Sequence, residues 1–487
     1  MKEASSLSGR VMQAVMWRSG TQILSQLITW TATIAVLRIL DPSDYGLFAM
    51  SQVVLAFLAF LSGHGFASSL IQSETVSRHQ IRQAFGMLLL LNSGIAGLQL
   101  GLGELASLYY RQPLVAELLR WQALIYLANP FLVLPQALMM RRMDFRKPAV
   151  INLIGAAVSA TTAIGCALAG WGVWTLVAAP IALFWTRAIC LTVAERLFIW
   201  PSFDFTGASR MFGFGSALMV SHFFWTIQMQ SDILIAGRFL DPHGLGLYAE
   251  ALFIAQMFAS RFVPPLNEVA FPAYAQLQDD RQALASAFCK ASGLILLIAL
   301  PFSFGMAVVA EPLILAMFGE KWADMVPFIR ILAAGMPLMT MTVLFSPATN
   351  AVGLPFITMK CSMIGAVIMP LCYLFGVQFG TSGLAWSALV AMALMLLVTF
   401  RLSKEAIGLS WRDLPAVFAL PAAAAGAMAL LVIAIDSALP PMAPLLRLLV
   451  LSGAGAAAYA GLLYFSARAT FRDVLQLVLR RKPLIAA

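Results

Sequence analysis

Charged and amide side chains stand inside long apolar stretches of this sequence, and their spacing is that of a helix. In the segment 17–39 they recur every three or four residues, as Arg18, Gln22, Gln26, Thr29 and Thr33. This spacing places them on one helical face. A polar stripe facing lipid is costly, so it must face protein or water. Arg18 also lies close enough to the start of the segment to be an interfacial anchor.

A second polar stripe occurs 200 residues later. His222 and Thr226 occupy the positions equivalent to Gln22 and Gln26. This equivalence predicts that both stripes face one central cavity. On a neighbouring face of the second segment lie Gln228 and Asp232.

The next apolar segment, 245–270, carries three further candidates. Arg261 lies ~24 Å into a ~30 Å hydrocarbon core if the helix begins near Leu245. It could face the cavity or extend to the cytoplasmic headgroups. Glu250 could pair with an arginine or carry a coupling proton, and Asn267 follows Arg261 toward the inner end.

These residues suit a substrate-binding or lumen-lining role, and none is assigned as catalytic, cofactor-binding or metal-binding. The sequence has no G-x-x-x-x-G-K-[ST] loop for nucleotide phosphates, and its four histidines lack metal-ligand spacing. We therefore expect a transporter without a cofactor. Coupling to H⁺ or Na⁺ stays open.

The composition of the chain predicts the type of secondary structure that carries these residues. The chain is 61% hydrophobic and 11% charged, against about 25% charged residues in soluble chains. Its apolar runs predict an all-α polytopic membrane protein with about fourteen spanning helices. Their ranges are 17–39, 46–69, 84–107, 118–140, 149–169, 172–194, 211–239, 245–270, 285–310, 325–348, 356–378, 382–402, 414–435 and 445–467.

Most Lys and Arg residues fall in one set of alternate connecting segments. Basic residues are enriched in cytoplasmic loops, so this asymmetry predicts that both termini are cytoplasmic. It also accounts for most of the net charge of +9 without a nucleic-acid partner.

The chain contains an internal repeat. Residues 38–48 return as 238–248 with six identities in eleven positions. An even number of crossings separates the copies, so the two lobes are parallel repeats. We expect an N-lobe over 1–200, a C-lobe over 201–405, each with six helices, and two final helices with a basic tail over 406–487.

The repeated motif has a structural interpretation. Asp41 and Asp241 suit a helix N-cap, and the prolines after them suit the first turn, so each copy should end one helix and start the next. The symmetry fails at Leu61, which is equivalent to Arg261. We therefore expect the functional residues to lie at positions where the two copies differ.

Five motifs resemble the polysaccharide-transporter family, the Wzx-type flippases of the multidrug/oligosaccharidyl-lipid/polysaccharide (MOP) exporter superfamily. They are Leu37–Pro42 with Tyr45–Leu47, Ser231–Leu240, Gly246–Tyr248, Phe271–Tyr274 and Gly172–Val177. The resemblance implies a V-shaped fold whose lobes rock around a cationic cavity, with Arg18 and Arg261 as partners for pyrophosphate.

The resemblance also implies a function. Such proteins translocate undecaprenyl-pyrophosphate-linked oligosaccharides across the bacterial inner membrane for O-antigen, capsule or exopolysaccharide synthesis. It implies membrane lipids, a polysaccharide polymerase and a chain-length regulator as partners.

Other functions compete with this one. A drug or metabolite cation antiporter of the same superfamily would favour acidic lobe residues. A membrane glycosyltransferase or polysaccharide polymerase would need a large outer loop, and a structural scaffold would not need two polar stripes.

Overall fold

The protein is helical throughout the residues that the computed structural model describes, which are 2–59, 77–204 and 216–466. Over 2–19 and 216–222 the description covers the backbone. Ten helical stretches in these ranges are long and apolar enough to cross a membrane. The predicted all-α membrane fold is confirmed.

Chain contacts divide the molecule into two compact units. The first comprises Met1–Thr226 with Asp241–Gly246, and the second comprises Ile227–Leu240 with Leu247–Ala487. Helices α10 (Ser216–Phe239) and α11 (Pro242–Ala255) therefore contribute to both units.

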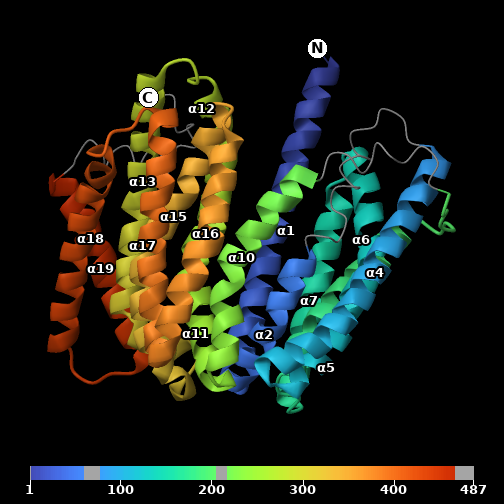
Figure 1. The fold of residues 1–487 in the computed structure, drawn as a ribbon, viewed down its shortest axis with the longest axis horizontal. Coiled ribbons are helices and arrows are strands. Elements are labelled where there is room, and N and C mark those ends of the chain that lie inside the picture. Colours follow the sequence, from blue (N-terminus) through green and yellow to red (C-terminus); the bar gives the residue numbers. More distant parts are fainter. Residues whose placement is uncertain (1, 60–76, 205–215, 467–487) are drawn as a thin grey trace. The chain divides into compact units, whose positions relative to one another are not determined.

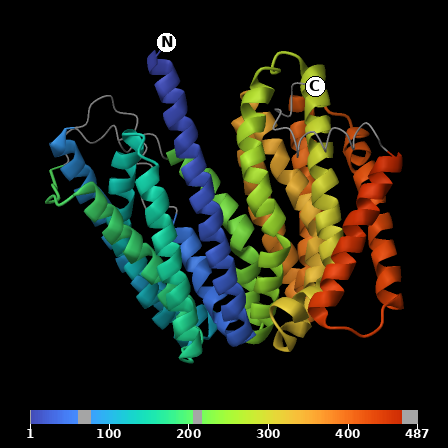
Figure 2. The ribbon, with the colours of Figure 1, turned by 180° about the vertical axis from the view of Figure 1, so that it is seen from behind.

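The first unit is built from seven further helices among the described residues. They are α1 (Lys2–Ile39), α2 (Pro42–Ala59), α4 (Arg78–Tyr110), α5 (Pro113–Gln122), α6 (Leu124–Arg141), α7 (Arg146–Leu168) and α8 (Trp174–Glu195). Helix α1 packs along α7, and α7 along α8, as both ribbon views show (Figures 1 and 2). An apolar core of this unit joins α4, α6, α7 and α8 around Phe85, Leu134 and Leu191.

The second unit contains the remaining helices and two short 3₁₀ turns. They are α12 (Met257–Ala275), α13 (Arg281–Val308), α14 (Ala310–Met317), η1 (Glu320–Met325), α15 (Val326–Ala351), α16 (Pro355–Gly376), η2 (Val377–Phe379), α17 (Gly380–Ile407), α18 (Asp413–Ala438) and α19 (Pro444–Ser466). In its core, Phe345 contacts Phe288 in a tilted arrangement and Phe400 edge to face.

Polar contacts join the last two helices to each other and to the rest of the second unit, beside their apolar packing on α13. At one end, Arg447 of α19 forms a bidentate pair with Asp436 of α18, at 2.7 and 2.8 Å, and a longer pair with Glu311 of α14 at 3.7 Å. Farther along α19, the Tyr459 hydroxyl donates to the Leu297 carbonyl of α13 at 2.7 Å. Polar contacts inside an apolar bundle fix the position of the α18–α19 pair against α13 and α14.

The repeated motif ends and starts helices at equivalent positions. Helix α1 ends at Ile39 and α10 at Phe239, while α2 begins at Pro42 and α11 at Pro242. The Asp241 carboxylate accepts hydrogen bonds from the backbone N–H groups of His243 and Gly244, at 3.2 and 3.3 Å. The predicted N-cap and helix boundary are therefore confirmed for this copy.

The two copies also touch each other through backbone. A Cβ atom on Gly46 would overlap the carbonyl oxygen of Pro242, and one on Gly246 would overlap that of Pro42. All four residues belong to the first unit. The motif glycine is thus required because the first turns of α2 and α11 cross at backbone contact.

Two helices predicted as continuous are interrupted. The segment 118–140 is divided into α5 and α6 at Ala123, and the segment 245–270 into α11 and α12 at Gln256. Neither position carries a proline or glycine, so no breaker marks it in the sequence. Helix α12 also continues to Ala275, beyond the predicted end.

Candidate functional site

In the polar stripe of α1, some side chains form hydrogen bonds with the backbone of their own helix and others do not. The hydroxyls of Thr29 and Thr33 donate to the carbonyls of Ser25 and Thr29, both at 2.9 Å. Gln22 is exposed and Gln26 is half-buried, and neither amide has a partner among the described residues. The two glutamines are therefore the groups of this stripe that still need water or a polar ligand. The Arg18 side chain lies outside the described part.

On α10 the candidates face the interior of the second unit rather than its surface. Gln228 and Asp232 are 8% and 3% exposed. Gln228 lies against Gly365 of α16, where a Cβ would overlap its Oε1 atom. Thr226, which belongs to the first unit, is also buried. The side chain of His222 lies outside the described part.

Asp232 is held by one side chain and by its own helix. The Tyr248 hydroxyl donates to Oδ2 at 3.3 Å, and the Ile233 backbone N–H donates to Oδ1 at 2.7 Å. No Lys, Arg or His pairs with Asp232 in the described ranges. A buried carboxylate without a cationic partner is unfavourable in an apolar bundle, so it is a candidate for function.

The Asp232–Tyr248 pair arises where the two repeats differ. At the offset of 200 residues, Asp232 corresponds to Ala32 and Tyr248 to Phe48. Both members of the hydrogen bond are therefore present in the second copy and both are absent from the first. The sequence showed each substitution, but not that α10 and α11 bring the two side chains together.

Glu250 of α11 is half-buried. It forms no ion pair with any described residue, so no described arginine neutralises it. Its role in coupling stays a prediction.

Arg261 lies on the exposed face of α12, beside Pro264, Pro265 and Glu268. Because α11 and α12 together run from Pro242 to Ala275, Arg261 is ~28 Å from the first end and ~21 Å from the second. It has no ion-pair partner among the described residues. Its equivalent, Leu61, lies outside them.

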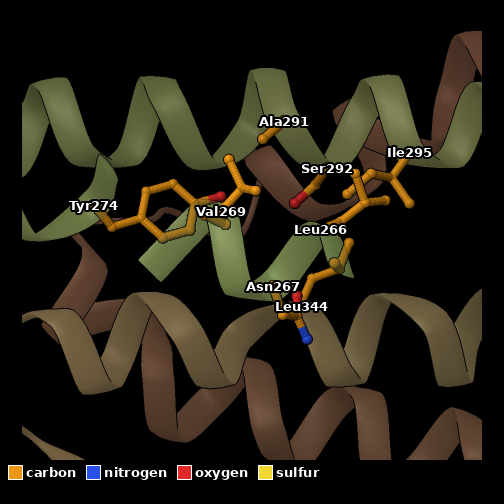
Figure 3. A pocket seen from close by; sticks show the side chains of 9 residues that line it. Leu266, Asn267, Val269, Tyr274, Ala291, Ser292, Ile295 and Leu344 are labelled. Carbon is orange, nitrogen blue, oxygen red and sulfur yellow. The ribbon is translucent and has the colours of Figure 1, made fainter. Parts of the chain in front are cut away.

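Asn267 lines a small cavity inside the second unit, together with residues of α13 and α15 (Figure 3). The cavity leaves about 20 Å³ for the centre of a water molecule. The oxygens of Asn267 and Ser292 are both buried there without a hydrogen-bond partner. A polar cavity of this size can hold one water molecule. Arg261, six residues earlier on α12 and about a third of a turn away around the helix, is exposed and does not line this cavity.

The structure therefore presents several separate polar positions. The exposed groups are Arg261 and Gln22, and Gln26 is half-buried. Gln228 and the hydrogen-bonded Asp232–Tyr248 pair are buried in the second unit. The sequence had indicated Tyr248 only as part of a repeated motif, and it had not indicated Ser292. Whether the exposed groups face one cavity between the lobes stays a prediction.

Comparison with known proteins identifies the family. Residues 35–327, more than half of the chain, match the family described as "Polysaccharide biosynthesis protein". The chain belongs to this family. Residues 214–442 also match the family described as "Lipid II flippase MurJ".

Two curated relatives extend the match. The succinoglycan biosynthesis transport protein ExoT of Rhizobium meliloti (strain 1021) is 26% identical, over 99% of this chain and 98% of ExoT. The lipopolysaccharide biosynthesis protein WzxC of Escherichia coli (strain K12) is 23% identical over 67% of each chain.

Solved structures share the fold. The lipid II flippase MurJ in an inward closed conformation matches with a TM-score of 0.73 at 12% identity, covering 94% of this chain and all of MurJ. An inward-facing multidrug resistance MATE transporter of the MOP superfamily matches with a TM-score of 0.61 at 14% identity, covering 80% of this chain and 94% of the transporter. The predicted MOP-type fold is confirmed.

Proposed function

We propose that this multi-span membrane protein translocates lipid-linked oligosaccharides for bacterial polysaccharide synthesis. The observation that carries the proposal is the match to ExoT, a transport protein of succinoglycan biosynthesis, over nearly the full length of both chains. The family match and the fold shared with a lipid II flippase support the same substrate class.

The substrate that we propose is an oligosaccharide on undecaprenyl pyrophosphate, moved from the cytoplasmic to the outer leaflet of the inner membrane. Arg261 suits the pyrophosphate, because a guanidinium binds phosphate oxygens through paired, charge-assisted hydrogen bonds. Its exposure and its lack of an ion-pair partner among the described residues leave it available for such a ligand. Gln22 and Gln26 would bind sugar hydroxyls.

The proposal also includes the orientation of the protein in the membrane, its partner proteins and its coupling ion. Both termini would be cytoplasmic, as the distribution of basic residues indicates. A polysaccharide polymerase and a chain-length regulator would receive the translocated unit. The buried Asp232 would carry the coupling charge, as H⁺ or Na⁺.

Depletion of the protein tests the function in its own host. We expect lipid-linked repeat units to accumulate in the cytoplasmic leaflet while the polymer disappears. Unchanged polymer in a host that has no paralogue would contradict the proposal.

A drug or metabolite antiporter is the second candidate, favoured by the fold shared with the MATE transporter. The two functions differ in what depletion does. Loss of an antiporter would raise sensitivity to cationic compounds and leave the lipid-linked intermediates unchanged.

A further inference from the structure

Arg187 of α8 has a buried guanidinium nitrogen without a hydrogen-bond partner. The residue is half-buried, its Nε atom is buried, and its side chain forms no hydrogen bond or ion pair with any described residue. The other described side chains with a buried, unpaired polar atom are hydroxyls and amides, which are neutral. A water molecule can satisfy a neutral group, whereas a cation inside the bundle also needs a counter-charge. The charge of Arg187 therefore selects an anion.

The packing of α7 against α8 places Arg187 well below the polar end of the two helices. At that end Arg142, just before α7, pairs with Glu195, the last residue of α8, at 2.9 Å. Arg187 lies about two turns before Glu195, ~12 Å along the helix. Farther from this end, the Ser159 hydroxyl of α7 donates to the Ala179 carbonyl of α8 at 3.0 Å. Arg187 thus lies between two fixed contacts of the α7–α8 interface.

The stem of Arg187 crosses Gly155 of α7 and does not run toward the Glu195 end. A Cβ atom on Gly155 would lie 2.8 Å from the Arg187 Cγ and 3.3 Å from its Cδ. Gly155 is itself ~14 Å from the start of α7 at Arg146. A helical side chain also leaves its backbone toward the helix N-terminus, which for α8 is the opposite end. These directions argue against an arginine that extends to the headgroups beside Glu195.

The surroundings of Arg187 are apolar, and its terminal nitrogens are accessible. The next residue, Ala188, and Leu191, one turn on, belong to the apolar core that joins α8 to α4 and α6. The two terminal NH₂ groups of Arg187 are neither buried nor paired within the described ranges, so they reach the surface of the first unit. An arginine at membrane depth without an internal counter-charge commonly marks a ligand pathway.

We propose that Arg187 binds the phosphate oxygens of a lipid. A guanidinium binds phosphate through paired, charge-assisted hydrogen bonds, and the phosphates of lipids are the main anions that a membrane offers. This site lies in the first unit, whereas Arg261 belongs to the second. The ligand is either the pyrophosphate of the transported lipid, a source that rests on the proposed function, or the phosphate of a bilayer phospholipid. The depth of Arg187 favours the first source, because phospholipid headgroups remain outside the hydrocarbon core.

Binding to the purified full-length protein tests the site with two probes. Geranylgeranyl pyrophosphate stands for the transported lipid and phosphatidylglycerol for the bilayer, and native mass spectrometry measures the affinity for each. We expect Arg187→Gln to weaken binding of the pyrophosphate probe by about 10- to 100-fold, the effect of losing a hydrogen bond to a charged group. Arg187→Lys should retain part of the affinity. The control is Arg401→Gln, which removes an exposed arginine paired with Glu405 and should bind as the wild type does.

The two probes separate the possible ligands. Weaker binding of phosphatidylglycerol alone in Arg187→Gln would assign the site to a bilayer lipid. Unchanged affinity for both probes would overturn the proposal. If the wild-type protein binds no pyrophosphate probe, the proposed function fails, and the phosphatidylglycerol measurement still decides whether Arg187 binds a lipid phosphate.

The unfolding midpoint separates ligand binding from a structural role. Arg187→Met removes the charge and the unpaired nitrogen but keeps an apolar stem against Gly155. We expect its midpoint without added lipid to equal or exceed that of the wild type, because the removed nitrogen has no partner to lose in the described ranges. Its affinity for the pyrophosphate probe should fall as in Arg187→Gln. A lower midpoint together with unchanged lipid affinity would overturn the proposal and make Arg187 a packing residue.

Discussion

At the scale of single residues, the second repeat differs from the first by a buried hydrogen-bonded pair. Asp232 and Tyr248 replace Ala32 and Phe48. A carboxylate inside a membrane bundle is destabilising unless it is paired, and its nearest described partners are a neutral hydroxyl and a backbone N–H. We infer that the pair is maintained for transport rather than for stability.

Replacing Asp232 by Asn tests this inference. The asparagine Oδ1 can still accept from the Ile233 backbone N–H, and its NH₂ group can donate to the Tyr248 hydroxyl oxygen, so the protein should fold at normal levels. Transport should fall by about tenfold or more, because the ionisable group is lost. The readout is transport of lipid-linked oligosaccharide per folded protein. Normal transport would make Asp232 a structural residue. Tyr248→Phe is the matched variant, and we expect it to have a smaller effect.

Arg261 can be tested in the same assay. Arg261→Ala should reduce transport by about 10- to 100-fold, since a hydrogen bond to a charged group contributes about 1.5–3 kcal/mol. Arg261→Lys should retain part of the activity, because the charge remains but the paired geometry does not. Folding should be unaffected, because Arg261 is exposed and forms no ion pair in the described ranges. Equal transport by all three proteins would assign Arg261 to the headgroup-anchor role.

At the scale of elements, the repeated motif fixes where helices end, start and cross. The sequence predicted the boundaries at Asp41 and Asp241, because capping and proline chemistry act within a few residues. It could not predict the breaks at Ala123 and Gln256, which no glycine or proline marks. It also could not predict that Asn267 lines a cavity that Arg261 does not reach, because that depends on which neighbours pack against each face of α12.

The crossing of α2 and α11 predicts that the motif glycines tolerate no side chain. Gly46→Ala and Gly246→Ala would each place a methyl group on a backbone carbonyl, which cannot rotate away. We expect each to destabilise the protein by about 1–3 kcal/mol. The measurement is the unfolding midpoint of the purified protein.

Gly94 and Gly97 provide the control for this prediction. Both are helical glycines of α4 with open space where a Cβ would lie. Their alanine variants should be neutral or stabilising by about 1 kcal/mol, because alanine favours the helix. If the control variants lost as much stability, the helix crossing would not explain the destabilisation of Gly46→Ala and Gly246→Ala.

At the scale of the whole molecule, the even offset between copies predicted parallel repeats, and the fold shared with MurJ agrees with a MOP-type protein. Composition and hydropathy were sufficient for the fold class because the bilayer permits few alternatives to spanning helices. They could not separate a flippase from a drug antiporter, since both transporter types share this fold. The family match and the ExoT relative favour polysaccharide transport.

Reconstitution is the most direct test of the central claim. The purified protein is placed in liposomes with a labelled polyprenyl-pyrophosphate oligosaccharide, and a membrane-impermeant glycosidase reports how much label reaches the outer leaflet. We predict that the wild-type protein exposes nearly all of the label, whereas empty liposomes expose about half. An exposed fraction equal to that of empty liposomes, under ion gradients of either direction, would contradict the account.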